Sequence, residues 1–213
     1  MTKKERMIEV VRRLKDVYPE AVCALHYTHD YELLFATRLS AQCTDARVNI
    51  VTERLFSDFP TLQSFAEASE EDIAEVIKSC GLFRTKARDL HASAVMLLAE
   101  YGGRVPDTME QLLRLPGVGR KTANVMLSVV WNRAAMAVDT HVFRVSERIG
   151  LTTGSKTPRQ TEEALVKNIP EEQIPLAHHW LILHGRYVCK ARRPDCLNCV
   201  IKEWCRYYSK AGE

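Results

Sequence analysis

Apolar residues recur along this chain at intervals of three and four, which is the spacing of one face of an α-helix. No stretch alternates convincingly between apolar and polar residues, as a half-buried strand would. The clearest helical series are Ile8, Val11, Leu14, Tyr18; Val48, Val51, Leu55, Phe59; and Leu90, Ala94, Leu97, Tyr101. The pattern therefore predicts an all-α protein with short connections and about ten helices, counted from start and stop signals.

Several helix boundaries can be read from local chemistry. Gly102 and Gly103 follow the third apolar series and are typical of a helix end. The segment Thr157-Pro158-Arg159-Gln160 has the pattern of a capping box with proline at the first helical position. Pro175 is expected to begin a further helix that contains Trp180 and Leu183.

Composition supports a folded protein and limits the classes it can belong to. The chain has 213 residues, of which 46% are hydrophobic, so one large or two small domains can each bury a core. No apolar stretch approaches the length that spans a bilayer. The charged N-terminus has no apolar signal core. We therefore expect a soluble, cytoplasmic and monomeric protein that does not enter membranes.

Charge is distributed unevenly, although the net charge is only +3. Residues 1–15 hold six basic and two acidic side chains, and residues 184–213 hold seven basic and three acidic ones. Residues 53–80 hold seven acidic and two basic side chains. If the two ends pack together, their cations could follow a phosphate backbone, but ordinary solvated helix surface explains the same pattern.

Four cysteines near the C-terminus have the spacing of metal ligands. They are Cys189, Cys196, Cys199 and Cys205, in the pattern C-x6-C-x2-C-x5-C. Four thiolates suit either an iron–sulfur cluster or structural zinc. Zinc sites usually have two short pairs, and only one is present here. The spacing thus favours a cluster and leaves zinc open.

The segment between these cysteines is rich in cations, including Lys190, Arg192 and Arg193. A loop fixed by a metal centre could hold such side chains against phosphates. The other three cysteines are scattered along the sequence and are most simply interpreted as small buried apolar side chains. They are Cys23, Cys43 and Cys80.

A glycine-containing turn separates two segments of helical spacing. It runs from Leu115 to Lys121 with the sequence LPGVGRK, and no strand precedes it. Gly117 and Gly119 permit a tight turn and a close approach of the backbone to a ligand. The helix that follows presents free N–H groups that suit a phosphate, although a plain interhelical turn has the same pattern.

Lys121 stands in the first turn of that helix, where the positive end of the helix dipole disfavours a cation. In a partly buried cleft beside Arg120, its pKa is expected to fall, which would make the amine a nucleophile. The alternative is a solvated lysine that only contacts phosphate.

Asp139 stands where a further helix is expected to begin, in the segment Val138-Asp139-Thr140-His141. Its simplest role is that of an N-cap. A helix from about Arg120 to Trp131 and a short return could instead bring it opposite Lys121. A carboxylate there would stabilise positive charge on a sugar ring, as in glycoside chemistry.

Together these motifs resemble the endonuclease III family of helix–hairpin–helix DNA glycosylases. The hairpin, the aspartate segment and the cysteine spacing all match that family. Further matches are Leu39–Asp45, Gly81–Phe83 and His178–Arg186, so the resemblance covers about residues 31–206. In combination these motifs are highly specific, whereas the hairpin alone is not.

The resemblance implies a fold and a set of site residues. It implies a six-helix barrel domain at residues 22–132, and a second domain of residues 1–21 and 133–213 with a [4Fe–4S] cluster. Lys121 matches the nucleophile and Asp139 its activator. Gln42 and Leu82 match residues that replace an extruded nucleotide, although Leu82 is also a plausible core leucine. His141 matches a residue of the lesion pocket, or is a hydrogen-bonded supporting histidine.

The resemblance also implies a reaction. The enzyme would remove oxidised pyrimidines from double-stranded DNA and cut the strand 3′ to the abasic site by β-elimination. Two alternatives remain. An adenine-specific mismatch glycosylase usually lacks the lysine and has an additional C-terminal domain. A non-catalytic iron–sulfur DNA-binding module would need the hairpin and cluster but neither Lys121 nor Asp139.

Overall fold

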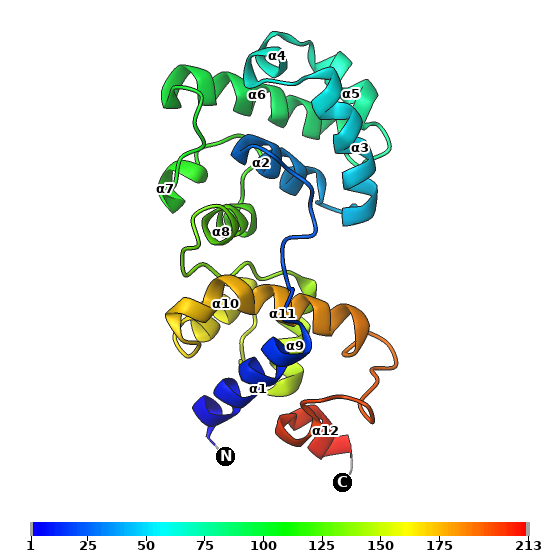
Figure 1. Ribbon diagram of the computed structural model, residues 1–213, viewed down its shortest axis with the longest axis vertical. Coiled ribbons are helices and arrows are strands. Elements are labelled where there is room, and N and C mark those ends of the chain that lie inside the picture. The colour runs from blue at the N-terminus through cyan, green and yellow to red at the C-terminus, as the bar shows by residue number, and fades with distance from the viewer. Residues whose placement is uncertain (1, 212–213) are drawn as a thin grey trace. The chain divides into compact units, whose positions relative to one another are not determined.

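A computed structural model describes residues 2–211, and all of the regular structure within them is helical (Figure 1). The described residues form twelve α-helices and two short 3₁₀ helices and contain no strand, which confirms the all-α prediction. Three helices are too short to show an apolar period, so counting start and stop signals misses them. They are α4 (Leu62–Glu67), α7 (Met109–Leu112) and α12 (Arg206–Ala211).

The chain divides into two compact units. The central unit is Cys23–Trp131, and the terminal unit combines Met1–Val22 with Asn132–Glu213. The domain boundaries expected from the resemblance, 21/22 and 132/133, differ from these by one residue each. The identity of the two domains as a barrel and a cluster domain stays a prediction.

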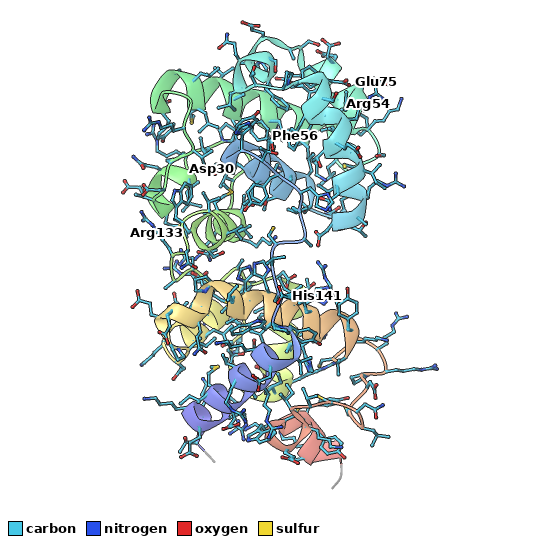
Figure 2. All side chains as sticks on the ribbon, in the orientation of Figure 1. Asp30, Arg54, Phe56, Glu75, Arg133 and His141 are labelled. Atoms are coloured by element: carbon cyan, nitrogen blue, oxygen red, sulfur yellow. The ribbon has the colours of Figure 1, made fainter. Side chains whose placement is uncertain are left out.

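The central unit is built around the long helix α6, against which α4 and α5 pack (Figure 1). Its core contains the aromatic pair Phe35 and Phe65, whose rings meet edge to face at 4.9 Å, and Phe56, labelled in Figure 2, lies beside Phe65. Besides α4 and α7, its helices are α2 (Asp30–Leu39), α3 (Asp45–Asp58), α5 (Glu70–Ile77), α6 (Phe83–Tyr101) and α8 (Arg120–Val129).

Helix α6 ends as the sequence predicts. Gly102 adopts a left-handed conformation with φ of 60°, and Gly103 N donates to Leu97 O at 2.8 Å. The apolar series Leu90, Ala94 and Leu97 is buried. An apolar face of about two turns is therefore covered inside the unit, which stabilises the helix more than its intrinsic propensity does.

The terminal unit packs α1 and α9 against α11. Its core joins residues from both ends of the chain, including Val10 and Leu14 with Val145 and Trp180. Besides α12, its helices are α1 (Lys3–Val17), α9 (Thr140–Ile149), α10 (Pro158–Val166), the 3₁₀ turn η1 (Glu171–Gln173), α11 (Ile174–Tyr187) and the 3₁₀ turn η2 (Lys202–Trp204).

Two local predictions in the terminal unit need correction. Ile8 was expected on the apolar face of α1, but it is 46% exposed, and Met7 is buried instead. The Thr157 side chain does cap α10 by accepting from Gln160 N. Gln160 Oε1, however, accepts from Lys156 N at 2.7 Å, so the reciprocal half of the expected capping box is absent.

The two ends of the chain pack together. This packing is the condition under which their basic side chains could form one common face. Arg6 Nε donates to Trp204 O at 2.8 Å, and the Arg13 guanidinium lies 4.5 Å from the centre of the Trp204 ring. Arg6 is buried, and burial lowers its pKa, so this cation supports the fold rather than a phosphate. Among the described residues, no helix combines the length and apolarity needed to cross a membrane.

Candidate active-site and cofactor-binding residues

A tight hairpin joins α7 to α8 in the central unit. Leu115 and Val118 are buried, and Val118 N donates to Leu115 O at 3.1 Å, which closes the turn. Gly117 has a φ of 71°, in the left-handed region that glycine favours. Gly119 occupies the N-cap of α8 without a side chain to cap the first N–H groups. The helix therefore begins with donors directed towards any ligand that approaches the turn.

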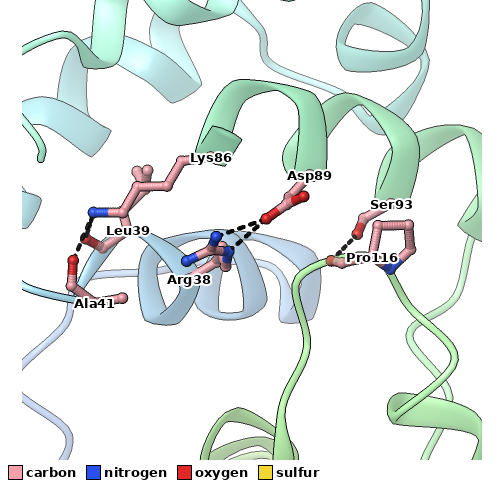
Figure 3. A network of polar contacts seen from close by, with 7 residues as sticks. All are labelled: Arg38, Leu39, Ala41, Lys86, Asp89, Ser93 and Pro116. Atoms are coloured by element: carbon pink, nitrogen blue, oxygen red, sulfur yellow. Dashed lines mark hydrogen bonds and ion pairs between the residues drawn. The ribbon is translucent and has the colours of Figure 1, made fainter. Parts of the chain in front are cut away.

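The hairpin rests on an ion pair that the sequence did not suggest (Figure 3). Arg38 from α2 donates through Nε and Nη2 to Asp89 Oδ2 of α6, at 2.9 and 2.7 Å. A β-carbon added to Gly117 would lie 2.5 Å from Asp89 Oδ2 and 2.6 Å from Arg38 Nε. Ser93 Oγ also donates to Pro116 O at 3.0 Å. The turn is thus seated on polar groups of two other helices, with no room for a side chain at position 117.

Gly117→Ala should destabilise the central unit by about 1–3 kcal/mol, because it adds backbone strain and displaces the Arg38–Asp89 pair. Gly119→Ala is the matched control, since nothing lies within 4 Å of its added β-carbon. Its cost should stay within the roughly 1 kcal/mol expected at an N-cap. Denaturant unfolding measures both, and equal losses for the two variants would contradict this account of the hairpin.

Lys121 is the second residue of α8, and its side chain is exposed. The expectation of a partly buried position is therefore wrong for this structure. Cys23 lies within electrostatic range of both Lys121 and Asp45. Burial raises the pKa of the Cys23 thiol, and the positive charge of Lys121 opposes that shift. The Lys121 side chain is thus accessible to solvent at the start of the helix that follows the hairpin.

Gln42 and Leu82 occupy two loops of the central unit and share an unusual backbone conformation. Both are non-glycine residues in the left-handed region, with φ of 56° and 60°. Leu82 is 57% exposed, which rules out its alternative role as a core leucine. Gln42 is exposed as well. Strain of this kind costs about 1–3 kcal/mol and persists where the surrounding structure imposes it, often at functional sites.

Asp139 caps α9 in the terminal unit. Its Oδ1 accepts from Val142 N at 2.8 Å, which confirms the N-cap role proposed from the sequence. Within the described residues, the cap engages only this oxygen, and Asp139 is half-buried. The carboxylate is thus held in a fixed orientation by the helix that it caps, a requirement for any catalytic role.

The four C-terminal cysteines line one pocket in the terminal unit. His184 lies on its wall, with Nε2 3.6 Å from Cys199 Sγ. Burial raises the pKa of Cys199 to about 11 and lowers the pKa of His184 to about 4. Among the described residues, no three His, Cys, Asp or Glu side chains are placed to hold one metal ion. The four cysteines thus share one pocket, as their spacing indicated, and their role as ligands of a metal centre stays a prediction.

Comparison with known proteins decides the family. Residues 35–171 match the HhH-GPD superfamily of base excision DNA repair proteins. Endonuclease III of Rickettsia felis is 45% identical to this chain, over 94% of the chain and 96% of the relative. Endonuclease III of Escherichia coli is 41% identical, over 97% and 98%. The chain belongs to the endonuclease III family.

Solved structures match the fold of this chain over nearly its whole length. One is described as a trapped covalent intermediate of endonuclease III with DNA; it has a TM-score of 0.94 and 41% identity, with all of both chains covered. A thermostable thymine-DNA glycosylase, at 23% identity and a TM-score of 0.87, shares the fold. Membership makes this chain an enzyme of base-excision DNA repair.

In this endonuclease III family member, α9 begins in the aspartate segment, and its side chains bind the cysteine loop (Cys189–Cys205). His141, labelled in Figure 2, lies one residue after the start of α9, and its Nδ1 is 3.2 Å from Arg144 Nη2. Arg144 also donates to Gly185 O at 2.9 Å and to Cys189 O at 3.2 Å. The first turn of α9 is thus tied by one side chain to both α11 and the first cysteine.

Arg148 holds the same loop one helical turn later. It donates to Lys190 O at 2.6 Å, to Ala191 O at 2.9 Å and to Cys189 Sγ at 3.6 Å. Sequence reasoning missed both Arg144 and Arg148. Their spacing of four places them on one face of α9, and that spacing, close to the aspartate segment, was a signal available in the sequence.

The cations of the cysteine loop point into solvent. Lys190, Arg192 and Arg193 are all exposed, and Arg193 has a left-handed φ of 51°. Arg148 holds the backbone carbonyls of Lys190 and Ala191, at the start of this basic segment, while the three cationic side chains stay accessible. Arg120 of the hairpin is exposed too. The side chains that are predicted to contact phosphates are therefore accessible, in the central unit for Arg120 and in the terminal unit for the other three.

Proposed function

We propose that this chain is a DNA glycosylase with an associated abasic-site lyase activity, and that it removes oxidised pyrimidines from double-stranded DNA. The observation that carries the proposal is the exposed amine of Lys121 directly after the hairpin, in a close relative of a protein whose structure is described as a covalent intermediate with DNA. An adenine-specific mismatch glycosylase has no use for that lysine. A non-catalytic module needs neither the lysine nor an oriented carboxylate.

The proposed reaction begins with Lys121 Nζ in its uncharged form. The amine attacks C1′ of the damaged nucleotide, a C–N bond forms, and the bond to the base breaks with its electron pair leaving on the base. Ring opening gives an imine, which makes the C2′ proton acidic. Loss of that proton expels the 3′ phosphate, so the strand is cut on the 3′ side. Water finally hydrolyses the imine and restores the amine.

Asp139 is proposed to act on the same sugar. Its carboxylate stabilises the positive charge that develops on the ring and accepts a proton from the attacking amine. The cap contact through Oδ1 orients the group, and Oδ2 is then the oxygen that would face the substrate. The fixed capping geometry supports this role because a mobile carboxylate would lose much of its effect.

The DNA contacts follow from exposure and charge. Gly117, Gly119 and Arg120 are proposed to bind phosphate through the free N–H groups and the cation of the hairpin. Lys190, Arg192 and Arg193 would contact further phosphates. Gln42 and Leu82 would fill the space of the extruded nucleotide, since an exposed leucine replaces stacking and an amide meets base edges. His141 is proposed to line the lesion pocket.

The cysteine pocket is proposed to hold a [4Fe–4S] cluster. Its ligands would be Cys189, Cys196, Cys199 and Cys205, which are soft donors that suit iron and that already face one cavity. The ligand spacing supports a cluster over zinc, because zinc sites usually have two short cysteine pairs and only Cys196 and Cys199 form one here. When bound, the cluster would fix the basic loop and take no part in the bond changes.

A panel of duplexes tests the activity directly. Each duplex carries one lesion, and base release and strand cutting are scored separately. We expect both products with oxidised pyrimidines. We further propose that the protein acts as a monomer associated with the nucleoid. Release of adenine opposite an oxidised guanine, with oxidised pyrimidines untouched, would favour the mismatch glycosylase. Binding without any product would favour the non-catalytic module.

Asp139→Ser separates the catalytic role of this residue from its capping role. Serine caps a helix about as well as aspartate, so unfolding free energy should change by less than about 0.5 kcal/mol. Base release should nevertheless slow by about 10²–10⁴-fold, because the carboxylate is lost. Asp139→Ala is the companion variant and should cost a further ~1 kcal/mol of stability. A serine variant with the original rate would leave Asp139 with a capping role only.

A further inference from the structure

Two loops of the central unit bring together two cysteines that lie far apart in the sequence. Cys43 follows Gln42 in the loop between α2 and α3, and Cys80 precedes Leu82 in the loop between α5 and α6. Their Sγ atoms are 3.8 Å apart. The expectation that these two cysteines are buried apolar side chains is confirmed for Cys80, which is fully buried, and wrong for Cys43, which is only half-buried.

The surrounding structure holds these loops against one another. Lys86 of α6 is fully buried, and its Nζ donates to Leu39 O at 2.8 Å and to Ala41 O at 2.7 Å (Figure 3). Helix α6, which follows the Cys80 loop, thus binds the backbone beside Cys43 through the Lys86 side chain. A β-carbon added to Gly81 would lie 3.9 Å from Gln42 O, so the two backbones are also in van der Waals range. The short sulfur–sulfur distance is a consequence of this fixed arrangement.

We propose that Cys43 and Cys80 are a redox modification site, which a peroxide converts into an intramolecular disulfide and a dithiol reductant restores. The two sulfur atoms must approach by about 1.8 Å to reach the length of a disulfide bond. Rotation about the side-chain bonds of two neighbouring cysteines can supply such a movement. None of the C-terminal cysteines takes part.

The chemistry assigns a different task to each sulfur. The half-buried Cys43 meets the oxidant: its thiolate attacks hydrogen peroxide, the O–O bond breaks, and a sulfenic acid and one water result. Cys80 then attacks Cys43 Sγ, the S–S bond forms, and the hydroxyl group leaves as a second water with the proton of Cys80. Two thiols and one peroxide thus give one disulfide and two waters, with two electrons passing from sulfur to oxygen.

Burial supports this order of events. It raises the pKa of Cys80 to about 11, and the neighbouring Cys43 adds to the shift. Cys80 therefore stays protonated at neutral pH and is a poor first target for an oxidant. Cys80 reacts once Cys43 has become a sulfenic acid. Because the two sulfur atoms are held close together, a small fraction of Cys80 thiolate is then sufficient. The positive charge of Lys86 acts in the opposite sense on the Cys80 thiol and favours its deprotonation.

The disulfide would fix the spacing of Gln42 and Leu82, since each lies within two residues of a bonded cysteine. Its meaning for DNA binding rests on the proposed function, in which these two side chains replace the extruded nucleotide. Formation of the bond does not depend on that function. It can therefore be tested on the protein alone, without DNA.

The experiment treats the intact, cofactor-loaded protein with limiting hydrogen peroxide. Remaining thiols are then alkylated, and the linkage is mapped by mass spectrometry of proteolytic peptides. We expect a cross-linked pair of peptides containing Cys43 and Cys80, lost on treatment with dithiothreitol. The melting temperature should rise by roughly 5 °C on oxidation, because the bond closes a long loop. Cys23, half-buried in the same unit, is the internal control and should remain alkylatable.

Single variants make the proposal falsifiable. In Cys80→Ala treated with excess peroxide, the sulfenic acid at Cys43 should react with a second peroxide to give sulfinic acid and water, because no second thiol traps it. In Cys43→Ala, Cys80 should stay reduced because it is buried. If the unaltered protein accumulates sulfinic acid at Cys43 or leaves both cysteines alkylatable when a reference thiol peptide is fully oxidised, the proposal is wrong. Disulfide formation in a protein that fails to process any lesion would remove the proposed function only.

Discussion

Lys121→Ala should abolish the covalent adduct that borohydride traps between the protein and DNA containing an abasic site. The amine is the only group proposed to bond to C1′, so its removal leaves no route to an imine. Strand cutting should fall by at least about 10³-fold, the scale on which an essential nucleophile acts. Trapped adduct is measured on denaturing gels, and its formation rate gives the size of the effect.

Two control variants separate chemistry from binding and folding. Lys121→Arg keeps a cation at the start of α8, but a guanidinium does not become neutral in proteins, so trapping should be lost while DNA affinity is retained. Lys78→Ala removes an exposed lysine of the same unit that is paired with Glu75, and it should trap normally. If Lys121→Ala traps as well as the unaltered protein, another amine is the nucleophile.

Cys199→Ser should cause the largest loss of stability. The thiol lines the pocket with the other three cysteines, and serine is a poor ligand for iron. Because a bound metal centre contributes its binding free energy to folding, we expect the terminal unit to lose about 4 kcal/mol or more. Iron and sulfide content of the purified protein, together with thermal unfolding, measure the effect.

Cys23→Ser is the matched control for this prediction, because it makes the same chemical change in the central unit. It should leave iron content unchanged. A purified, unaltered protein that is colourless and contains zinc instead of iron would refute the cluster. Full iron content in Cys199→Ser would instead remove this residue from the ligand set and leave the pocket in need of another donor.

Helix α9 links the proposed catalytic carboxylate to the proposed cluster site in the terminal unit. Its N-cap is Asp139, and its side chains Arg144 and Arg148 hold the backbone of the cysteine loop. A bound cluster would therefore stabilise the same helix that orients the carboxylate. Loss of the cluster should affect catalysis through this helix even though the cluster takes no part in the bond changes.

Local chemistry was sufficient for much of this protein. The end of α6 at Gly102, the start of α9 at Asp139 and the start of α8 after Gly119 follow from capping and glycine conformation, which act within a few residues. The four C-terminal cysteines also share one pocket, as their spacing indicated. Short loops between such ligands leave few other arrangements.

Contacts between distant segments were decided only by tertiary packing. Cys43 and Cys80 are 37 residues apart and Arg38 and Asp89 are 51 apart, yet each pair is in contact. No local period reports such pairs, because helix packing sets which faces meet. The same reason explains why Leu82 is exposed and Lys86 is buried, against the ordinary preference of each residue type. The sequence alone thus determined most helices and the types of reactive side chain. Tertiary packing determined which of those side chains meet and which are exposed.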